Sequence, residues 1–319
     1  MPFILSFVIA YVIVYLLIPT FRKLAFKIDF LDKPRENVER KIHREPIALT
    51  ASYPIFIGFI VSYFVMTRDF SIQAGAITLG ALMLIGIGTI DDWYKTKGKD
   101  FPVLPKLLVQ LVPGVLVFFS GIAFKGFFNP FNSEYILFPV WLQLFLTVLW
   151  VFGVTTVVNF TDGMDGLAAG ISTISASTLF IVAILTNQNN SAVMAAAIVG
   201  VALAYLKYNR PPAKIFMGDA GATFIGFIIS VISLDGVFKQ ATILSMGIPI
   251  LALGVPIFDN IYVVIKRILR KQPFYQADAS QAHYRLLKLG LSQLQVLTFL
   301  CLISICLGLS SIIIALVQK

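Results

Sequence analysis

Residues 141–185 read WLQLFLTVLWVFGVTTVVNFTDGMDGLAAGISTISASTLFIVAIL, two apolar runs joined by the polar turn NFTDGMDG at 159–166. Each run approaches the ~20 residues that a helix needs to cross the hydrocarbon core of a bilayer. Backbone N–H and C=O groups find no partners in lipid, so apolar runs of this length must be helices. The stretch therefore predicts two successive transmembrane helices with a polar turn at a membrane surface.

The rest of the chain repeats this pattern. It has 319 residues, 58% of them hydrophobic, and a mean hydropathy of +0.88. This composition excludes a soluble domain and predicts an all-α, polytopic integral membrane protein in which residues 1–319 form a single domain. We expect about ten transmembrane helices, at 2–21, 47–66, 74–90, 104–124, 140–158, 167–186, 192–207, 220–238, 241–265 and 293–317.

Basic residues orient these helices. The segments 22–46, 91–106, 207–214 and 266–288 all fall on one side of the membrane and contain 21 of the 25 Lys and Arg residues. Cytoplasmic loops are enriched in Lys and Arg, so this side is predicted to be cytoplasmic and both termini are predicted to lie outside. The net charge of +9 fits this orientation, attraction to anionic lipid headgroups, and binding of an anionic substrate. We expect no nucleic acid partner, because no basic stripe with interleaved aromatic residues is present.

The same side carries acidic residues at the ends of apolar runs. Asp91 and Asp92 are adjacent at the end of the third run. Neighbouring carboxylates repel each other, so at least one requires a cation or a raised pKa. The pair suits Mg²⁺ binding or general base catalysis, and solvation of a helix end by water is an equally good explanation of this motif alone.

The turn at 159–166 is more specific. It contains Asn159, Asp162, Asp165 and two glycines within eight residues. If helical, the two acids lie three residues apart on one face at the start of the next helix. Capping of that helix explains one aspartate and leaves the rest of the cluster unexplained, which favours a binding or catalytic site.

The segment 209–221 is the third polar connection. Pro211-Pro212 forces an extended backbone, because proline excludes the preceding residue from the α region. Asp219 then stands at the start of the eighth run, where it can cap the helix. Asn209 and Phe216 add an amide and an aromatic ring, which suit hydrogen bonding and stacking on a nucleotide base.

These segments resemble the polyprenyl-phosphate N-acetylhexosamine-1-phosphate transferases, the family that includes phospho-N-acetylmuramoyl-pentapeptide transferase. The similarity extends from the first loop to the last, in one order along the chain. It is carried by Asp32-Lys33-Pro34, Arg40-Lys41-Ile42-His43, Asp91-Asp92, Lys106-Leu107-Leu108-Val109-Gln110 and the blocks around Asp162 and Asp219.

The resemblance implies a reaction and its partners. A sugar-1-phosphate moves from a UDP-N-acetylhexosamine to an undecaprenyl or other polyprenyl phosphate in the bilayer, and UMP is released. The cofactor implied is Mg²⁺, for which Mn²⁺ can substitute, and the location is a bacterial plasma membrane with the active site facing the cytoplasm. A homodimer is left open.

The resemblance also implies residue roles. The catalytic residues are Asp91, Asp92, Asp162 and His283, and the metal ligands are Asp219 and Asp92. The substrate-binding residues are Arg40, His43, Lys106, Asn159, Asp165, Asn209, Phe216 and Arg285. Phe216 suits stacking on uracil, and Lys106 suits a phosphate.

The chain departs from the family pattern in two places. Ala51-Ser52 replaces a glycine pair, and Gln281-Ala282-His283-Tyr284-Arg285 retains one histidine where several are usual. Gln and Tyr donate hydrogen bonds and carry no imidazolium charge, so we expect the choice of sugar to be made in this loop. Asp259 lies within the ninth run, where we expect it to pair with a neighbouring side chain, with Lys266 or Arg267 two turns away turning inward, and to lie outside the site.

Three functions compete. The leading one is transfer of N-acetylglucosamine-1-phosphate from UDP-N-acetylglucosamine as the first membrane step of cell-wall or surface polysaccharide synthesis, such as teichoic acid. The second is a phospho-N-acetylmuramoyl-pentapeptide transferase, disfavoured by the missing histidines. The third is a cation- or proton-coupled transporter, disfavoured because the acids cluster at one membrane face.

Overall fold

The computed structural model describes residues 1–34, 45–129, 134–236, 243–271 and 279–318. Arg40 and His43, both expected to bind substrate, lie outside these residues. The described chain folds into helices at α1 Pro2–Lys27, α2 Ser52–Thr67, α3 Ile72–Thr96, α4 Val103–Phe119, α5 Val140–Thr161, α6 Leu167–Leu185, α7 Asn189–Asn209, α8 Gly218–Gly236, α9 Ile243–Ala252, α10 Gly254–Leu269, α11 Ala282–Lys288 and α12 Gln293–Val317.

Each apolar run of the sequence corresponds to a helix or a helix pair. Within the described residues, α1, α3, α5, α6, α7, α8 and α12 are long and apolar enough to cross a membrane. The helices α2 and α4 are apolar and shorter, and α9 with α10 forms one further span if the bent pair is counted together. The chain is therefore a helical, multi-span membrane protein.

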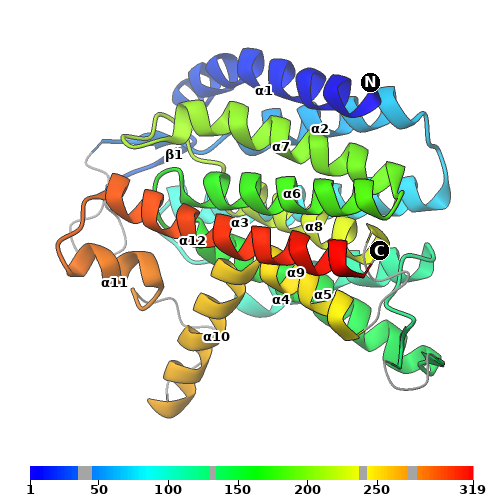
Figure 1. Cartoon of the computed structure of the whole chain (residues 1–319). Helices are drawn as coiled ribbons and strands as arrows, with labels where there is room; N and C mark the ends of the chain where they lie inside the picture. The colour runs from blue at the N-terminus through cyan, green and yellow to red at the C-terminus, as the bar shows by residue number, and fades with distance from the viewer. Residues whose placement is uncertain (35–44, 130–133, 237–242, 272–278, 319) are drawn as a thin grey trace.

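Helix α8 forms the centre of the bundle. It packs against α3, α5 and α7, and 89% of its most apolar 18-residue stretch is buried inside the protein. Helices α1 and α12 lie at the periphery (Figure 1). Only 22% of the most apolar stretch of each is buried inside the protein. Their large exposed apolar side chains, such as Leu16 and Ile313, suit contact with lipid chains.

The ninth run, expected as one helix over 241–265, is broken in the structure. Helices α9 and α10 meet at an angle of 82°, and α10 points away from the bundle (Figure 1). Pro249 lies inside α9, and Gly254 and Pro256 open α10. Proline removes a backbone donor and clashes with the preceding turn, so this sequence favours a break.

Two small antiparallel sheets accompany the helices. Strands β1 (Leu31–Asp32) and β2 (Ile47–Ala48) pair, as do β3 (Gly126–Phe128) and β4 (Tyr135–Leu137). An isolated bridge joins Ala48 to Ile215, which ties the segment before α8 to β2. Both termini lie at one end of the bundle, while β1 and α11 lie at the other (Figure 1).

Candidate active site

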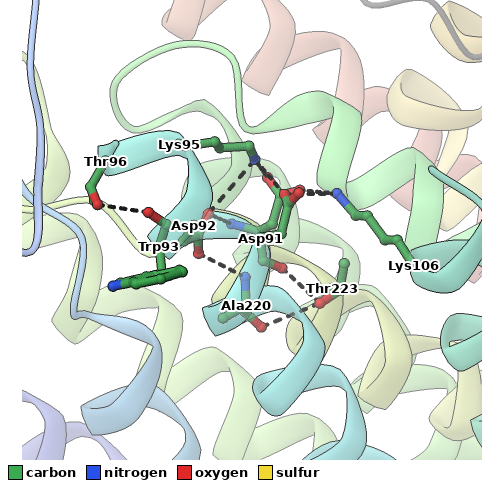
Figure 2. Close-up of polar contacts among 9 residues, drawn as sticks. Asp91, Asp92, Trp93, Lys95, Thr96, Lys106, Ala220 and Thr223 are labelled. Carbon is green, nitrogen blue, oxygen red and sulfur yellow. Dashed lines mark hydrogen bonds and ion pairs between the residues drawn. The ribbon is translucent and has the colours of Figure 1, made fainter. Parts of the chain in front are cut away.

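The end of α3 meets the start of α8 through Asp92. Its carboxylate accepts the backbone N–H groups of Asp219 at 3.1 Å and Ala220 at 3.3 Å (Figure 2). The first N–H groups of a helix have no partners within the helix, so a carboxylate supplied by a neighbouring helix satisfies them and opposes the positive end of the helix dipole. Asp92 therefore fixes the position of Asp219 in addition to offering its own oxygens.

Gly218 makes this contact possible. Its φ is +62°, in the left-handed region where glycine is favoured. A Cβ atom at this position would lie 2.3 Å from Oδ2 of Asp92. The residue before Asp219 must therefore lack a side chain for Asp92 to reach the helix start.

Asp91, Asp92 and Asp219 form a cluster with two lysines. Lys95 Nζ lies 2.8 Å from Asp91 Oδ2 and 2.6 Å from Asp219 Oδ1. Lys106 Nζ, from α4, lies 3.0 Å from Asp91 Oδ2 and also donates to Asp219 Oδ2 (Figure 2). Asp91 and Asp92 are buried, so these ion pairs offset the cost of holding carboxylates out of water.

The three carboxylates suit a hard divalent cation. One oxygen from each lies within 4.8 Å of the other two. Mg²⁺ takes oxygen ligands at ~2.1 Å in an octahedron, so neighbouring ligand oxygens lie about 3 Å apart and opposite ones about 4 Å apart. The donor set therefore fits the cation implied by the sequence.

The connection between α5 and α6 contributes Asp162, which follows the last residue of α5. Burial raises the pKa of this carboxyl to about 8, and the negative charges of Asp219 and Asp92 add to the effect. Asp162 thus belongs to the electrostatic environment of the acid cluster. Asn159 is half-buried in the last turn of α5, and its backbone carbonyl accepts the N–H of Asp162.

Asp165 and Asn209 join two connections of the chain. Asp165 Oδ2 accepts the N–H of Ala213 at 2.9 Å. Asn209, which is buried, accepts the N–H of Gly166 at 2.8 Å and donates to the carbonyl of Ile215 at 3.0 Å. Both side chains therefore hold 162–166 against 209–217, and their expected contacts with substrate remain predictions.

Phe216 is half-buried two residues before the start of α8. Its backbone N–H donates to the carbonyl of Ala48 at 2.8 Å, and its carbonyl accepts the N–H of Ala51. These bonds fix the backbone that carries the ring. Stacking of the ring on uracil remains a prediction.

His283 lies on α11 and packs against the 162–166 connection. Its side chain is 2% exposed, and burial lowers the pKa of the imidazole to about 4. Within the described residues, its Nε2 atom has no hydrogen-bond partner. The histidine is therefore neutral near pH 7, with Nε2 buried against Gly163, and its catalytic role remains a prediction.

Arg285, on the same helix, pairs with Asp259 of α10, with NH2 3.2 Å from Oδ1. Asp259 thus pairs with a side chain as expected, and the partner is Arg285 of α11, where Lys266 or Arg267 of the same run were the candidates. Contact between Arg285 and a substrate phosphate remains a prediction.

Lys95 is the residue of this cluster that the sequence prediction missed. It lies four residues after Asp91 and three after Asp92, the spacings that bring side chains together on one helical face. That spacing was a readable signal, since a basic residue at this position necessarily meets the acidic pair once the helix extends to Thr96.

The chain is similar in sequence to several proteins named as transferases. The chain is 35% identical over 310 residues to a probable undecaprenyl-phosphate N-acetylglucosaminyl 1-phosphate transferase of Bacillus subtilis strain 168, covering 97% of this chain and 84% of the relative. It is 31% identical over 296 residues to a phospho-N-acetylmuramoyl-pentapeptide-transferase of Halalkalibacterium halodurans, covering 89% and 87%. It is 26% identical over 307 residues to a decaprenyl-phosphate N-acetylglucosaminephosphotransferase of Mycobacterium leprae, covering 88% and 75%.

The family model of glycosyl transferase family 4 matches residues 74–237. This match begins within α3 and ends just after α8, so it includes Asp91, Asp92 and Asp219, Lys95 and Lys106 between them, and the connections around Asp162 and Asn209. Together with the relative that is 35% identical over almost the whole chain, it identifies the protein: the chain belongs to glycosyl transferase family 4, a family of sugar-phosphate transferases.

Proposed function

We propose that the protein transfers N-acetylglucosamine-1-phosphate from UDP-N-acetylglucosamine to undecaprenyl phosphate and releases UMP. An oxygen of the lipid phosphate forms a bond to the β-phosphorus of the nucleotide sugar. The bond between that phosphorus and the oxygen bridging to the α-phosphate breaks, and UMP leaves with this oxygen. The product carries the sugar on a lipid diphosphate and begins a cell-wall or surface polysaccharide.

The observation that carries this proposal is the meeting of Asp91, Asp92 and Asp219 with Lys95 and Lys106 at the ends of three helices. Phosphoryl transfer depends mainly on positioning and on neutralising charge around an in-line displacement. The lysines supply positive charge for phosphate oxygens, and the carboxylates supply ligands for a divalent cation. The relative of 35% identity supports the choice of sugar and lipid.

Asp91 is proposed to orient the lipid phosphate. A phosphate monoester has a second pKa of about 6, so the attacking phosphate is already largely a dianion near neutral pH and needs little help from a base. Lys95 and Lys106 are proposed to turn from the carboxylates toward the substrate phosphates when a cation binds. A route through an aspartyl-phosphate intermediate is the second mechanism to be considered.

The cation is proposed to be Mg²⁺, with Mn²⁺ as a substitute, held by Asp219 and Asp92. When bound, it would neutralise charge on the phosphate oxygens. Differential scanning fluorimetry of the purified protein tests this without turnover. Added Mg²⁺ should raise the unfolding temperature of the wild type and have no such effect on Asp219→Asn.

The membrane arrangement is part of the proposal. Ten spans arise if α2, α4 and the bent pair α9–α10 each cross the bilayer with the seven longer helices. The concentration of Lys and Arg on the side of the acid cluster supports a cytoplasmic active site in a bacterial plasma membrane, with both termini outside. Labelling of single cysteines introduced near Met1 and at Asp100 tests this orientation in intact cells.

The activity is tested with detergent-purified protein, UDP-N-acetylglucosamine, undecaprenyl phosphate and Mg²⁺, measuring released UMP. Asp219→Asn should lower the rate by about 10² or more, because it removes charge from the centre of the cluster. Asp100→Asn changes an exposed aspartate in the loop after α3 and should leave the rate unchanged. Absence of UMP release with every UDP-N-acetylhexosamine would refute the transferase.

A phospho-N-acetylmuramoyl-pentapeptide transferase is the second candidate, favoured by the relative of 31% identity. The same assay distinguishes the two. UMP release with UDP-N-acetylmuramoyl-pentapeptide and none with UDP-N-acetylglucosamine would make this the function.

A further inference from the structure

Helix α10 carries an acidic residue, Asp259, that faces the protein. Its lipid-side residues, including Phe258 and Ile261, are about half exposed, whereas the Asp259 side chain is 16% exposed. Acidic residues are costly within an apolar span and need partners. Those partners come from α11, not from α10 itself.

Asp259 binds the first turn of α11 with both oxygens. The backbone N–H of Ala282 lies 2.8 Å from Oδ1 and 3.0 Å from Oδ2. Ala282 is the first residue of α11, and its N–H has no partner within that helix. The capping group of α11 is thus a side chain from another helix.

Arg285, one turn further along α11, also binds α10. Its NH2 group donates to Asp259 Oδ1 at 3.2 Å, and its guanidinium carbon lies 4.1 Å from the ring centroid of Tyr262. Asp259 and Tyr262 are three residues apart on one face of α10, so they hold the guanidinium together.

The opposite side of α11 packs against the connection that carries Asp162. Tyr284 donates its hydroxyl to the carbonyl of Gly163 at 3.2 Å, and a Cβ atom at Gly163 would lie 2.4 Å from His283 Nε2. Helix α11 is therefore clamped between Asp259 and the 162–166 connection. It has only seven residues, so its placement depends on these contacts more than on its own stability.

We propose that Asp259 is a positioning residue for the transfer reaction. By holding the start of α11 and the Arg285 guanidinium, it keeps His283 against the 162–166 connection that carries Asp162. It touches no substrate and acts through α11. The proposal rests on the proposed transferase function for its kinetic part, whereas its structural part is independent of that function.

The first test compares three variants by hydrogen exchange of the peptide covering 282–288 and by UMP release. Asp259→Asn should raise exchange in this peptide and lower kcat about tenfold or more, because small displacements of reacting groups are costly. The KM for undecaprenyl phosphate should change by less than about twofold, because Asp259 does not contribute to binding of the substrate in its ground state. Asp259→Glu keeps the charge, so it should recover part of the protection of 282–288 from exchange and part of kcat. Asn260→Ala, which alters the adjacent polar residue whose Nδ2 has no partner among the described residues, should leave both unchanged.

The second test is a double-mutant cycle with Arg285→Gln. If Asp259 acts through Arg285 and α11, Asp259→Asn should lower kcat much less in the Arg285→Gln background than in the wild type. Additive losses would overturn the proposal, as would unchanged exchange of 282–288 or an Asp259→Glu variant as impaired as Asp259→Asn. If the wild type released no UMP, the transferase function would fail, while the exchange data would still decide whether Asp259 holds α11.

Discussion

Gly88 on α3 and Ala220 on α8 are in contact at the backbone: a Cβ atom on Gly88 would lie 2.3 Å from the Cα of Ala220. This contact lies one turn below Asp91 and Asp92 and one residue after Asp219. The spacing of the acid cluster is therefore set by how closely two helices approach each other.

Gly88→Ala should separate the two helices and weaken the cluster. Overpacking a close contact costs about 1–3 kcal/mol of folding free energy, so we expect a lower unfolding temperature together with a large loss of UMP release. Gly86→Ala is the matched control, since Gly86 lies on the same helix and no atom beyond its own helical turn comes within 4 Å of its Cβ position. Equal behaviour of the two variants in fluorimetry and in the UMP assay would contradict the proposed role of the contact.

Lys95 should be needed for activity. Replacement by Met keeps an apolar side chain of similar length and removes the charge that pairs with Asp91 and Asp219. We expect kcat to fall by about 10² or more, because the positive charge is lost from the phosphate site. Lys97→Met provides the comparison: Lys97 lies 3.8 Å from the Trp93 ring centroid, and its loss should have little effect on UMP release.

Asp162 should make the metal-free protein less stable as pH rises. Its folded pKa of about 8 lies above the ordinary value of 3.8, so the folded state holds a proton that the unfolded state has released. The stabilisation is complete below about pH 4 and is lost as pH rises to about 8. Unfolding temperatures of the wild type should fall between about pH 6 and pH 8, and Asp162→Asn should fall less. Parallel curves for the two proteins would exclude this pKa.

His283 should make the protein less stable as pH falls. Its folded pKa of about 4 lies below the ordinary 6.5, so protonation favours the unfolded state. Stability contributed by the neutral imidazole is complete above about pH 6.5 and is lost as pH falls to about 4. His283→Gln should therefore lose less thermal stability than the wild type between about pH 6.5 and pH 5 in fluorimetry. A variant as acid-sensitive as the wild type would show that His283 is solvated.

Hydropathy and acid placement predicted much of this structure from the sequence. The apolar runs became helices, because backbone groups in lipid have no other solution. Asp91, Asp92 and Asp219 lie together as expected, since each stands at a helix end on the same side of the bundle. Lys106, identified by its resemblance to a phosphate-binding lysine, donates to this same cluster.

The remaining features depend on information that hydropathy does not contain. The residues on both sides of the break between α9 and α10 are apolar, and only Pro249, Gly254 and Pro256 signalled it. Asp165 and Asn209 also join two backbone segments that are far apart in sequence, a role that their local sequence does not specify. The pairing of Asp259 with Arg285 likewise depends on the position of α11, which no local pattern specifies.

The two ammonium groups among the three carboxylates have an electrical consequence. With all five groups ionised, the pocket carries one surplus negative charge, which repels a diphosphate and a lipid phosphate alike. A bound divalent cation would add two positive charges and make the net charge of the pocket positive. Anionic reactants would then be attracted to the pocket with such an ion bound and repelled without it, by charge balance alone.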